Sequence, residues 1–247
     1  MEDNPEILAF VHGADYGSTA NWMHLYWWFE DQELCKGSDG RILPLILSRG
    51  NHDMQVGFEE NFYIGSPSSG SGSGYYFGTQ FSAQFHLLTM NTEISVAGDQ
   101  YDWLEEALAR ERPRQRWLVA NYHRPAYPVH KDVNAAPFKR VRDNWVPLFE
   151  RHNIDLALES DGHTLKRTLP IRNNKPDASG IVYIGEGGLG VPQRVPDTSR
   201  WFIQEPGFAT SAHNVHVLRA DGDRLQITAF GMEGDTLDHY SRVPRTR

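Results

Sequence analysis

The chain has 247 residues, enough for one large domain or two small ones, and 39% of them are hydrophobic while 23% are charged. A net charge of −8 without any basic tract argues against binding to a nucleic-acid backbone. The single cysteine, Cys35, excludes an intrachain disulfide and a cysteine-based zinc site, and no run of about 18 apolar residues predicts a membrane span.

The first third of the chain alternates apolar runs with polar loops. The run ILAFV at residues 7–11 predicts a buried strand, and aromatic residues at roughly helical spacing predict a helix over 22–34. Residues 44–48 predict a second buried strand, which ends directly at RGNHD. That stretch suits an ordinary turn, but an open α/β sheet also places ligand-binding loops at this kind of position. Residues 65–74 (GSPSSGSGSG) predict a flexible surface loop.

The remainder of the chain is expected to contain two further helices and many strands. Apolar residues at helical spacing predict helices over 99–112 and 138–152. The expected strands are 75–81, 84–90, 117–122, 156–158, 166–171, 180–184, 214–218, 224–230 and 237–243. Strands and helices that alternate first and then give way to strands indicate an α/β domain of the α+β type, built in layers.

Four predicted strands end in side chains that can bind metals. Asp15, Asn51, His123 and His163 each follow the end of a strand. Each also has an ordinary interpretation: Asp15 as a helix cap or turn residue, Asn51 as a turn residue, and His123 as a structural histidine. Taken together, a carboxylate, an amide oxygen and imidazoles are ligands for Zn²⁺, Mn²⁺ or iron, which favours a metal site.

The motifs at these positions carry a family resemblance. HGADYG, RGNHD, YHRPAYP and ESDGHTLKRT, in this order, resemble the calcineurin-like metallophosphoesterases, in particular the branch that includes the purple acid phosphatases. The resemblance implies a β-sandwich flanked by helices over residues 1–247. It also implies a centre of two metal ions (iron, zinc or manganese) and a small phosphorylated substrate.

The resemblance implies a role for each candidate ligand. Asp15 would bridge the two metals, Asn51 and His123 would bind the second metal, and His163 would bind the first. At the late motif the family has His-x-His, whereas this chain has Asp-Gly-His, so Asp161 would take the place of the first histidine as an oxygen ligand.

Other residues beside the motifs would act on the substrate. The resemblance implies that His52 hydrogen-bonds the phosphate and protonates the leaving oxygen, with Asp53 as a candidate to orient it. Arg124 and Lys166 are cations next to the motif loops, where they meet phosphate oxygens or are ordinary solvated surface charges.

Two further departures from the family pattern concern the start of the chain. No strand ending in Asp-x-His precedes residue 7, so the domain is expected to be N-terminally truncated and to lack its first strand together with a ligand of the first metal. Ser18 stands where the purple branch has a metal-binding tyrosine, so no iron–tyrosinate colour is expected.

These observations predict a phosphoesterase that acts through a metal-bound hydroxide, on phosphomonoesters or phosphodiesters. The alternative is a degraded family member whose impaired metal site binds a phosphorylated ligand or a protein. The family resemblance implies an extracellular or periplasmic protein, although the sequence shows no signal peptide. Nothing in the sequence indicates the oligomeric state or the identity of the substrate.

Overall fold

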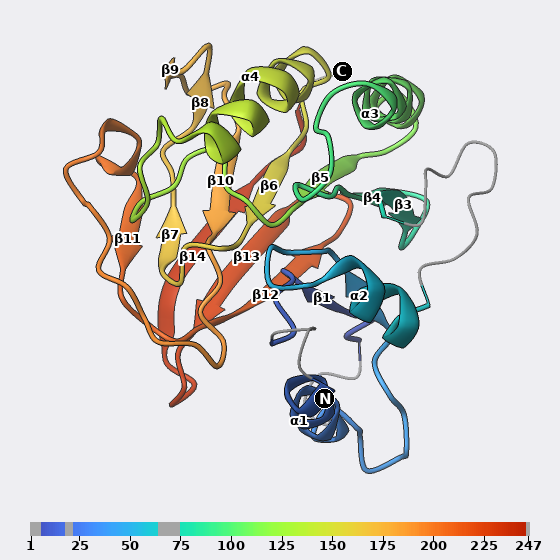
Figure 1. Cartoon of the computed structure of the whole chain (residues 1–247). Coiled ribbons are helices and arrows are strands. Elements are labelled where there is room, and N and C mark those ends of the chain that lie inside the picture. The colour runs from blue at the N-terminus through green and yellow to red at the C-terminus, as the bar shows by residue number, and fades with distance from the viewer. Residues whose placement is uncertain (1–5, 18–21, 64–74, 246–247) are drawn as a thin grey trace.

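The computed structural model describes residues 6–17, 22–63 and 75–245, and a seven-stranded mixed sheet lies at its centre (Figure 1). Across the sheet the order is β11 (Phe208–Thr210), β7 (Leu165–Arg167), β10 (Val182–Gly185), β6 (Leu156–Glu159), β5 (Trp117–Asn121), β4 (Phe85–Thr89) and β3 (Phe77–Gln80). The four strands β10, β6, β5 and β4 run parallel to one another. Their carboxyl ends therefore share one edge of the sheet.

Two helices cover one face of this sheet. All five residues of β5, Trp-Leu-Val-Ala-Asn, are buried, as expected for a strand that is covered on both faces. Helix α3 (Asp99–Glu111) and helix α4 (Ala136–Arg151) supply the cover, and Leu104 and Trp145 belong to the same buried cluster as Leu118 of β5.

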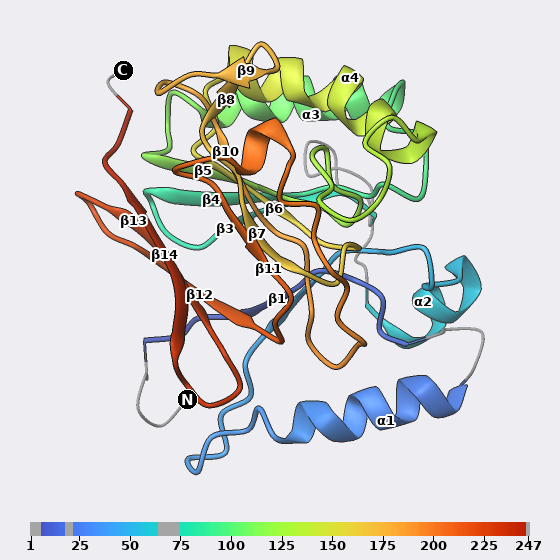
Figure 2. The same cartoon turned by 90° about the vertical axis from the view of Figure 1, so that its left-hand side faces the viewer.

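A three-stranded antiparallel sheet covers the other face. It consists of β12 (Val215–Ala220), β13 (Leu225–Phe230) and β14 (Thr236–Arg242). Residues of β13 alternate between buried and partly buried, and Leu225 and Ile227 pack in one cluster with Val119 of β5. Figure 2 shows the resulting layers of helices, central sheet and second sheet. The predicted α/β architecture with two packed sheets and flanking helices is confirmed in this outline.

The N-terminal part adds a small subassembly beside these layers. Strands β1 (Phe10–His12) and β2 (Leu45–Leu47) form a separate parallel pair. Helix α1 (Trp22–Glu33) and helix α2 (Gln55–Asn61) lie near it, on the side of the molecule away from α3 and α4 (Figure 2). Leu25, Phe58 and Phe62 pack around the fully buried ring of Tyr16.

Several elements differ from the predictions. Helix α2 and strand β11 were not predicted, and the single strand expected over 166–171 is divided into β7 and β8 (Ile171–Arg172), the latter paired with β9 (Lys175–Pro176). Pro170 lies between the two pieces and has no N–H to donate to a strand ladder. The expected loop at 65–74, like Ser18, lies outside the described residues. In the part of the chain that the structure describes, no helix is both long and apolar enough to cross a membrane.

Candidate metal centre

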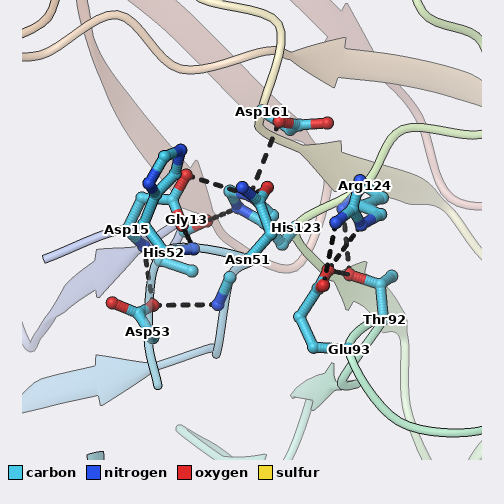
Figure 3. A network of polar contacts seen from close by, with 12 residues as sticks. Gly13, Asp15, Asn51, His52, Asp53, Thr92, Glu93, His123, Arg124 and Asp161 are labelled. Carbon is cyan, nitrogen blue, oxygen red and sulfur yellow. Dashed lines mark hydrogen bonds and ion pairs between the residues drawn. The ribbon is translucent and has the colours of Figure 1, made fainter. Parts of the chain in front are cut away.

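Four loops meet at the carboxyl ends of parallel strands (Figure 3). Asp15 follows β1, Asn51 follows β2, His123 follows β5 and Asp161 follows β6. Strand β1 runs parallel to β2, and β5 runs parallel to β6. Because parallel strands end at the same edge of a sheet, the polar residues that follow each pair lie close together. One ligand atom each from Asp15, His123 and Asp161 lies within 4.8 Å of the other two.

His123 lies at the centre of this group and is 1% exposed. Its Nδ1 lies 2.8 Å from the carbonyl oxygen of Gly13 and must donate to it, because a carbonyl can only accept. The other ring nitrogen, Nε2, lies 3.2 Å from Oδ2 of Asp15, 3.2 Å from Oδ1 of Asn51 and 3.7 Å from Oδ1 of Asp161. In metal-binding histidines, one ring nitrogen typically donates to a carbonyl or carboxylate, which orients the ring so that the other nitrogen can bind the metal.

The charges of Asp15 and His123 support each other. Burial alone would raise the pKa of Asp15, but its hydrogen bond to His123 and the charge on that ring lower the pKa to about 2. Burial also opposes the charged form of His123, yet the hydrogen bond and charge of Asp15 raise the pKa of the imidazole. A metal cation would compete with the proton for the same nitrogen, because ligand imidazoles bind in the neutral form.

Asp53 joins the loop after β1 to the loop after β2. Its buried carboxylate accepts hydrogen bonds from the backbone N–H groups of Asp15, Tyr16 and Gly50 at 2.8, 3.0 and 2.9 Å. Burial raises the pKa of Asp53 to about 6, although these three donors favour the charged form. The carboxylate therefore fixes the geometry of the loop that carries Asp15, and its predicted role of orienting His52 stays a prediction.

Gly50 allows the two loops to come close. A Cβ at this position would lie 2.2 Å from Oδ1 of Asp15 and 2.8 Å from Cε1 of His123. Neither distance leaves room for a carbon atom, so the glycine of the GNHD motif is required by the packing of the candidate ligands themselves.

The backbone around the cluster adopts conformations that side chains disfavour. Ala14, Asp15, Asp161 and His163 have φ angles of 83°, 59°, 69° and 56°. The other described non-glycine residues with positive φ are Asn153, Asn173 and Asn174. Asparagine, aspartate and histidine are enriched in this region, whereas Ala14 is a clearer outlier; backbone strain of this kind costs on the order of 1–3 kcal/mol per residue and gathers at functional sites.

Asp161 has an incomplete set of partners. Its side chain is 3% exposed, and Oδ1 forms an ion pair with Nζ of Lys131. Oδ2 is buried and has no hydrogen-bond partner among the described residues. Buried polar atoms are normally paired. The close-set ligand atoms of Asp15, His123 and Asp161, with Oδ1 of Asn51 at the same imidazole nitrogen, fit one metal ion, and the carboxylate of Asp161 has an oxygen without a partner in the described residues.

His163 does not belong to the cluster. Its Nδ1 lies 3.2 Å from the carbonyl oxygen of Pro192. Burial, followed by the charge of Arg194 and more weakly that of Lys131, lowers the pKa of His163. In the described ranges 6–17, 22–63 and 75–245, no second group of three His, Cys, Asp or Glu side chains has metal-ligand spacing.

Two of the predicted substrate-contacting residues, His52 and Arg124, lie beside the cluster (Figure 3). His52 is exposed, and its backbone N–H donates to Oδ1 of Asp15 at 3.0 Å. The guanidinium of Arg124 donates to both carboxylate oxygens of Glu93 at 2.6 and 2.9 Å. Burial opposes the charge of Arg124, but Glu93 outweighs it and raises the pKa of the guanidinium. The roles given to His52 and Arg124 stay predictions.

Both interpretations of Lys166 were wrong. The side chain is fully buried, so it is neither a solvated surface charge nor a phosphate ligand in this conformation. Its Nζ donates to the carbonyl of Tyr127 at 2.6 Å, to Glu159 at 2.5 Å and to Glu186 at 2.8 Å. The error arose because its acidic partners are distant along the chain, Glu159 at the end of β6 and Glu186 directly after β10, where the local sequence gives no sign of the pairing.

Comparison with known proteins shows which family this chain resembles. A model of the calcineurin-like phosphoesterase family matches residues 2–167. Purple acid phosphatase 23 of Arabidopsis thaliana is 27% identical over 183 residues, which cover 70% of this chain and 39% of that protein. The chain spans about two fifths of the length of the curated relatives that head this comparison.

Two solved structures share the fold. The purple acid phosphatase PPD1 from yellow lupin (Lupinus luteus) seeds has a TM-score of 0.79 and 18% identity, covering 98% of this chain and 47% of its own. GAP50, described as the anchor in the inner membrane complex of Plasmodium, has a TM-score of 0.75 and 10% identity, covering 99% and 81%. At these identities the likeness concerns the fold alone.

The resemblance read from the four motifs is therefore confirmed, both by the family model and by relatives named as purple acid phosphatases. Since that model matches well over half of the chain and includes Asp15, Asn51, His123, Asp161 and His163, the protein belongs to the calcineurin-like phosphoesterase family.

Proposed function

We propose that this protein is a metal-dependent phosphoric ester hydrolase that acts on phosphomonoesters or phosphodiesters. The observation that carries the proposal is the convergence of Asp15, Asn51 and Asp161 around Nε2 of His123. Membership of a family of phosphoesterases supports the same chemistry. A small phosphorylated molecule is the substrate class that follows.

The metal would be held by two carboxylates, an amide oxygen and an imidazole. This mixture of oxygen and nitrogen ligands suits Zn²⁺, Mn²⁺ or iron. An ion bound there would polarise the phosphoryl group and provide a nucleophilic water at neutral pH. The family resemblance implies a further ion, the first metal of the pair, bound by Asp15 and His163, and metal analysis measures the number of ions per chain directly.

His52 and Arg124 are proposed to act on the ester itself. His52 follows Asn51 directly, and its backbone is bonded to Asp15, so its exposed ring starts from the rim of the cluster. From that place an imidazole can donate a proton to the leaving oxygen. Arg124, held by Glu93, presents a permanent positive charge beside the cluster for a phosphoryl oxygen.

The test is hydrolysis by the purified protein loaded with Mn²⁺, Zn²⁺ or iron. Nitrophenyl phosphate and bis(nitrophenyl) phosphate report the two ester classes. We expect turnover of at least one of them and its loss on addition of EDTA. His123→Ala should lower kcat/KM by at least about a hundredfold, since metal-supported catalysis fails with its ligand. His239→Ala, at an exposed site on β14, is the matched control. A folded, metal-loaded sample that hydrolyses neither ester would refute the proposal.

A second candidate is a catalytically degraded member that binds a phosphorylated ligand or a protein partner. The observation that favours it is the single cluster of metal-type side chains in the described residues, with an aspartate where the family pattern has a histidine. The similarity to GAP50, a protein named as an anchor, is compatible with such a role. Binding of orthophosphate by a metal-loaded sample that shows no turnover would support this candidate over the first.

A further inference from the structure

Lys131 is a cation inside the candidate metal centre that sequence reasoning did not single out. Its Nζ forms an ion pair with Oδ1 of Asp161, the oxygen that lies 3.7 Å from Nε2 of His123. The lysine side chain is 26% exposed, whereas that of Asp161 is 3% exposed. The ammonium therefore contacts the buried cluster while part of the lysine side chain remains open to solvent.

The backbone around Lys131 is held from a second segment. Arg200 donates through Nη2 to the carbonyl of Lys131 at 2.9 Å, and the backbone N–H of Asp197 donates to the carbonyl of Val129 at 2.7 Å. Nζ also lies 5.8 Å from the ring centroid of Phe138 at the start of α4. These contacts hold the backbone of Lys131 in place, so that its side chain extends from a fixed position to the cluster.

Arg194 brings a second cation to the same loop. Its backbone N–H donates to the carbonyl of His163 at 3.0 Å, and its Nη1 donates to the carbonyl of Asp161 at 3.3 Å. Lys131 and Arg194 thus approach the loop 161–163 together. Any further cation bound at His163 would meet two positive charges in a partly buried setting, where screening by water is weak.

We propose that the centre holds a single metal ion and that the ammonium of Lys131 supplies the second positive charge, binding a phosphoryl oxygen of the ester. The inference rests on the proposed function and deepens it. One divalent ion balances the carboxylates of Asp15 and Asp161, and Lys131 then leaves a net positive charge that an anionic ester requires. The side chains present do not fit a centre of two ions, because His163, the expected ligand of the other ion, lies outside the one cluster of metal-type side chains in the described residues.

The experiment counts metal and measures the binding of orthophosphate. The wild type, Lys131→Met and Lys131→Arg are loaded with Mn²⁺, and bound metal is measured by plasma mass spectrometry after gel filtration. Titration calorimetry then gives the Kd of orthophosphate for each loaded protein. Lys139→Met is the matched control, because Lys139 is an exposed lysine on α4 that pairs with Asp143 one helical turn away.

We expect one ion per chain in all four proteins. Lys131→Met should weaken orthophosphate binding about ten- to a hundredfold, the worth of one charge-assisted hydrogen bond, while Lys131→Arg and Lys139→Met should stay within about threefold of the wild type. The metal content of Lys131→Met after gel filtration shows whether that variant is folded, and Lys131→Arg, which keeps a positive charge there, tests whether the charge itself binds phosphate.

Distinct results would overturn the inference and the proposed activity. Two ions per wild-type chain, or unchanged orthophosphate affinity in Lys131→Met, would overturn the inference while ester turnover remained. One ion with Lys131-dependent phosphate binding, but no turnover, would support the inference and refute hydrolysis. A wild type that binds no metal would refute both.

Discussion

The ammonium of Lys166 lies 2.8 Å from Oε1 of Glu186, and both side chains are fully buried. Glu159 is the second carboxylate on the same ammonium. Burial raises the pKa of Glu186, although Lys166 favours its charged form. The backbone N–H groups of Ala126 and Val129 donate to these two glutamates, so the network also holds the loop that follows His123.

Lys166→Met should destabilise the protein strongly, because it leaves two acidic groups buried without their cation. Removing one partner of a buried ion pair costs about 3–5 kcal/mol. We expect the free energy of unfolding in urea at pH 7 to fall by that amount. Lys139→Met, which breaks an exposed pair on α4, should change it by less than about 1 kcal/mol. Equal effects of the two substitutions would show that the buried network contributes nothing special.

Gly50→Ala should damage the metal centre more than the fold. The new carbon would overlap Oδ1 of Asp15 and press on the ring of His123, so the ligands must move apart. We expect Mn²⁺ affinity, measured by titration calorimetry, to fall at least about tenfold. Changes to the groups that orient metal ligands typically have an effect of this size.

Gly222→Ala provides the control for that variant. A carbon added at Gly222 would meet its nearest described neighbour, Oε1 of Gln84, at 3.8 Å, which is an ordinary contact. Its metal affinity should equal that of the wild type. If Gly50→Ala bound Mn²⁺ equally well, the close packing of loops around Asp15 and His123 would not describe the protein in solution.

His52→Ala should slow catalysis without loss of metal. General acid catalysis contributes about 10²–10⁴-fold, and a good leaving group needs less help from an acid. The drop in kcat should therefore be large for alkyl phosphates and small for dinitrophenyl phosphate, with metal content unchanged. A drop of the same size for every leaving group would assign His52 a role in binding or in loop structure instead.

The sequence predicted the elements whose patterns are local. A continuous apolar run predicted strand β5, and apolar residues at helical spacing predicted helix α3; both lie within a residue of the expected bounds. Helix α2 was missed because a helix of seven residues is too short to show a clear periodic pattern. Its Phe58 is buried through packing against Tyr16, which lies in the loop after β1. Strand β11 was missed because its three residues acquire strand structure through pairing with β7.

The candidate site divides in the same way. Asp15, Asn51 and His123 were found because each follows a strand end, and strand ends of a parallel sheet meet. The same reasoning selected His163, which lies outside the cluster, whereas Asp161 was found only through its place in the family's late motif. Lys131 and Lys166 could not be placed, because their partners Asp161, Glu159 and Glu186 are fixed by tertiary packing. The sequence does not distinguish the two lysines, although Lys131 pairs with Asp161 of the cluster and Lys166 is fully buried between two glutamates.

His216 on β12 should make stability depend on pH. Burial lowers the pKa of His216 from 6.5 to about 4, and the charge of Asp238 only partly offsets this. The unfolded chain therefore takes up a proton at higher pH than the folded protein does. The stabilising contribution is fully present above pH 6.5 and is lost as pH falls toward 4, with little further change below.

His216→Phe should remove this contribution, because phenylalanine has a ring but no titrating group. The full shift would correspond to about 3 kcal/mol, and partial exposure of the residue reduces our expectation to about 2 kcal/mol. Urea unfolding of the EDTA-treated wild type and variant at pH 7 and pH 4.5 measures the difference. The wild type should lose more stability than the variant between these values, and parallel losses would show that the imidazole is not kept neutral by the fold.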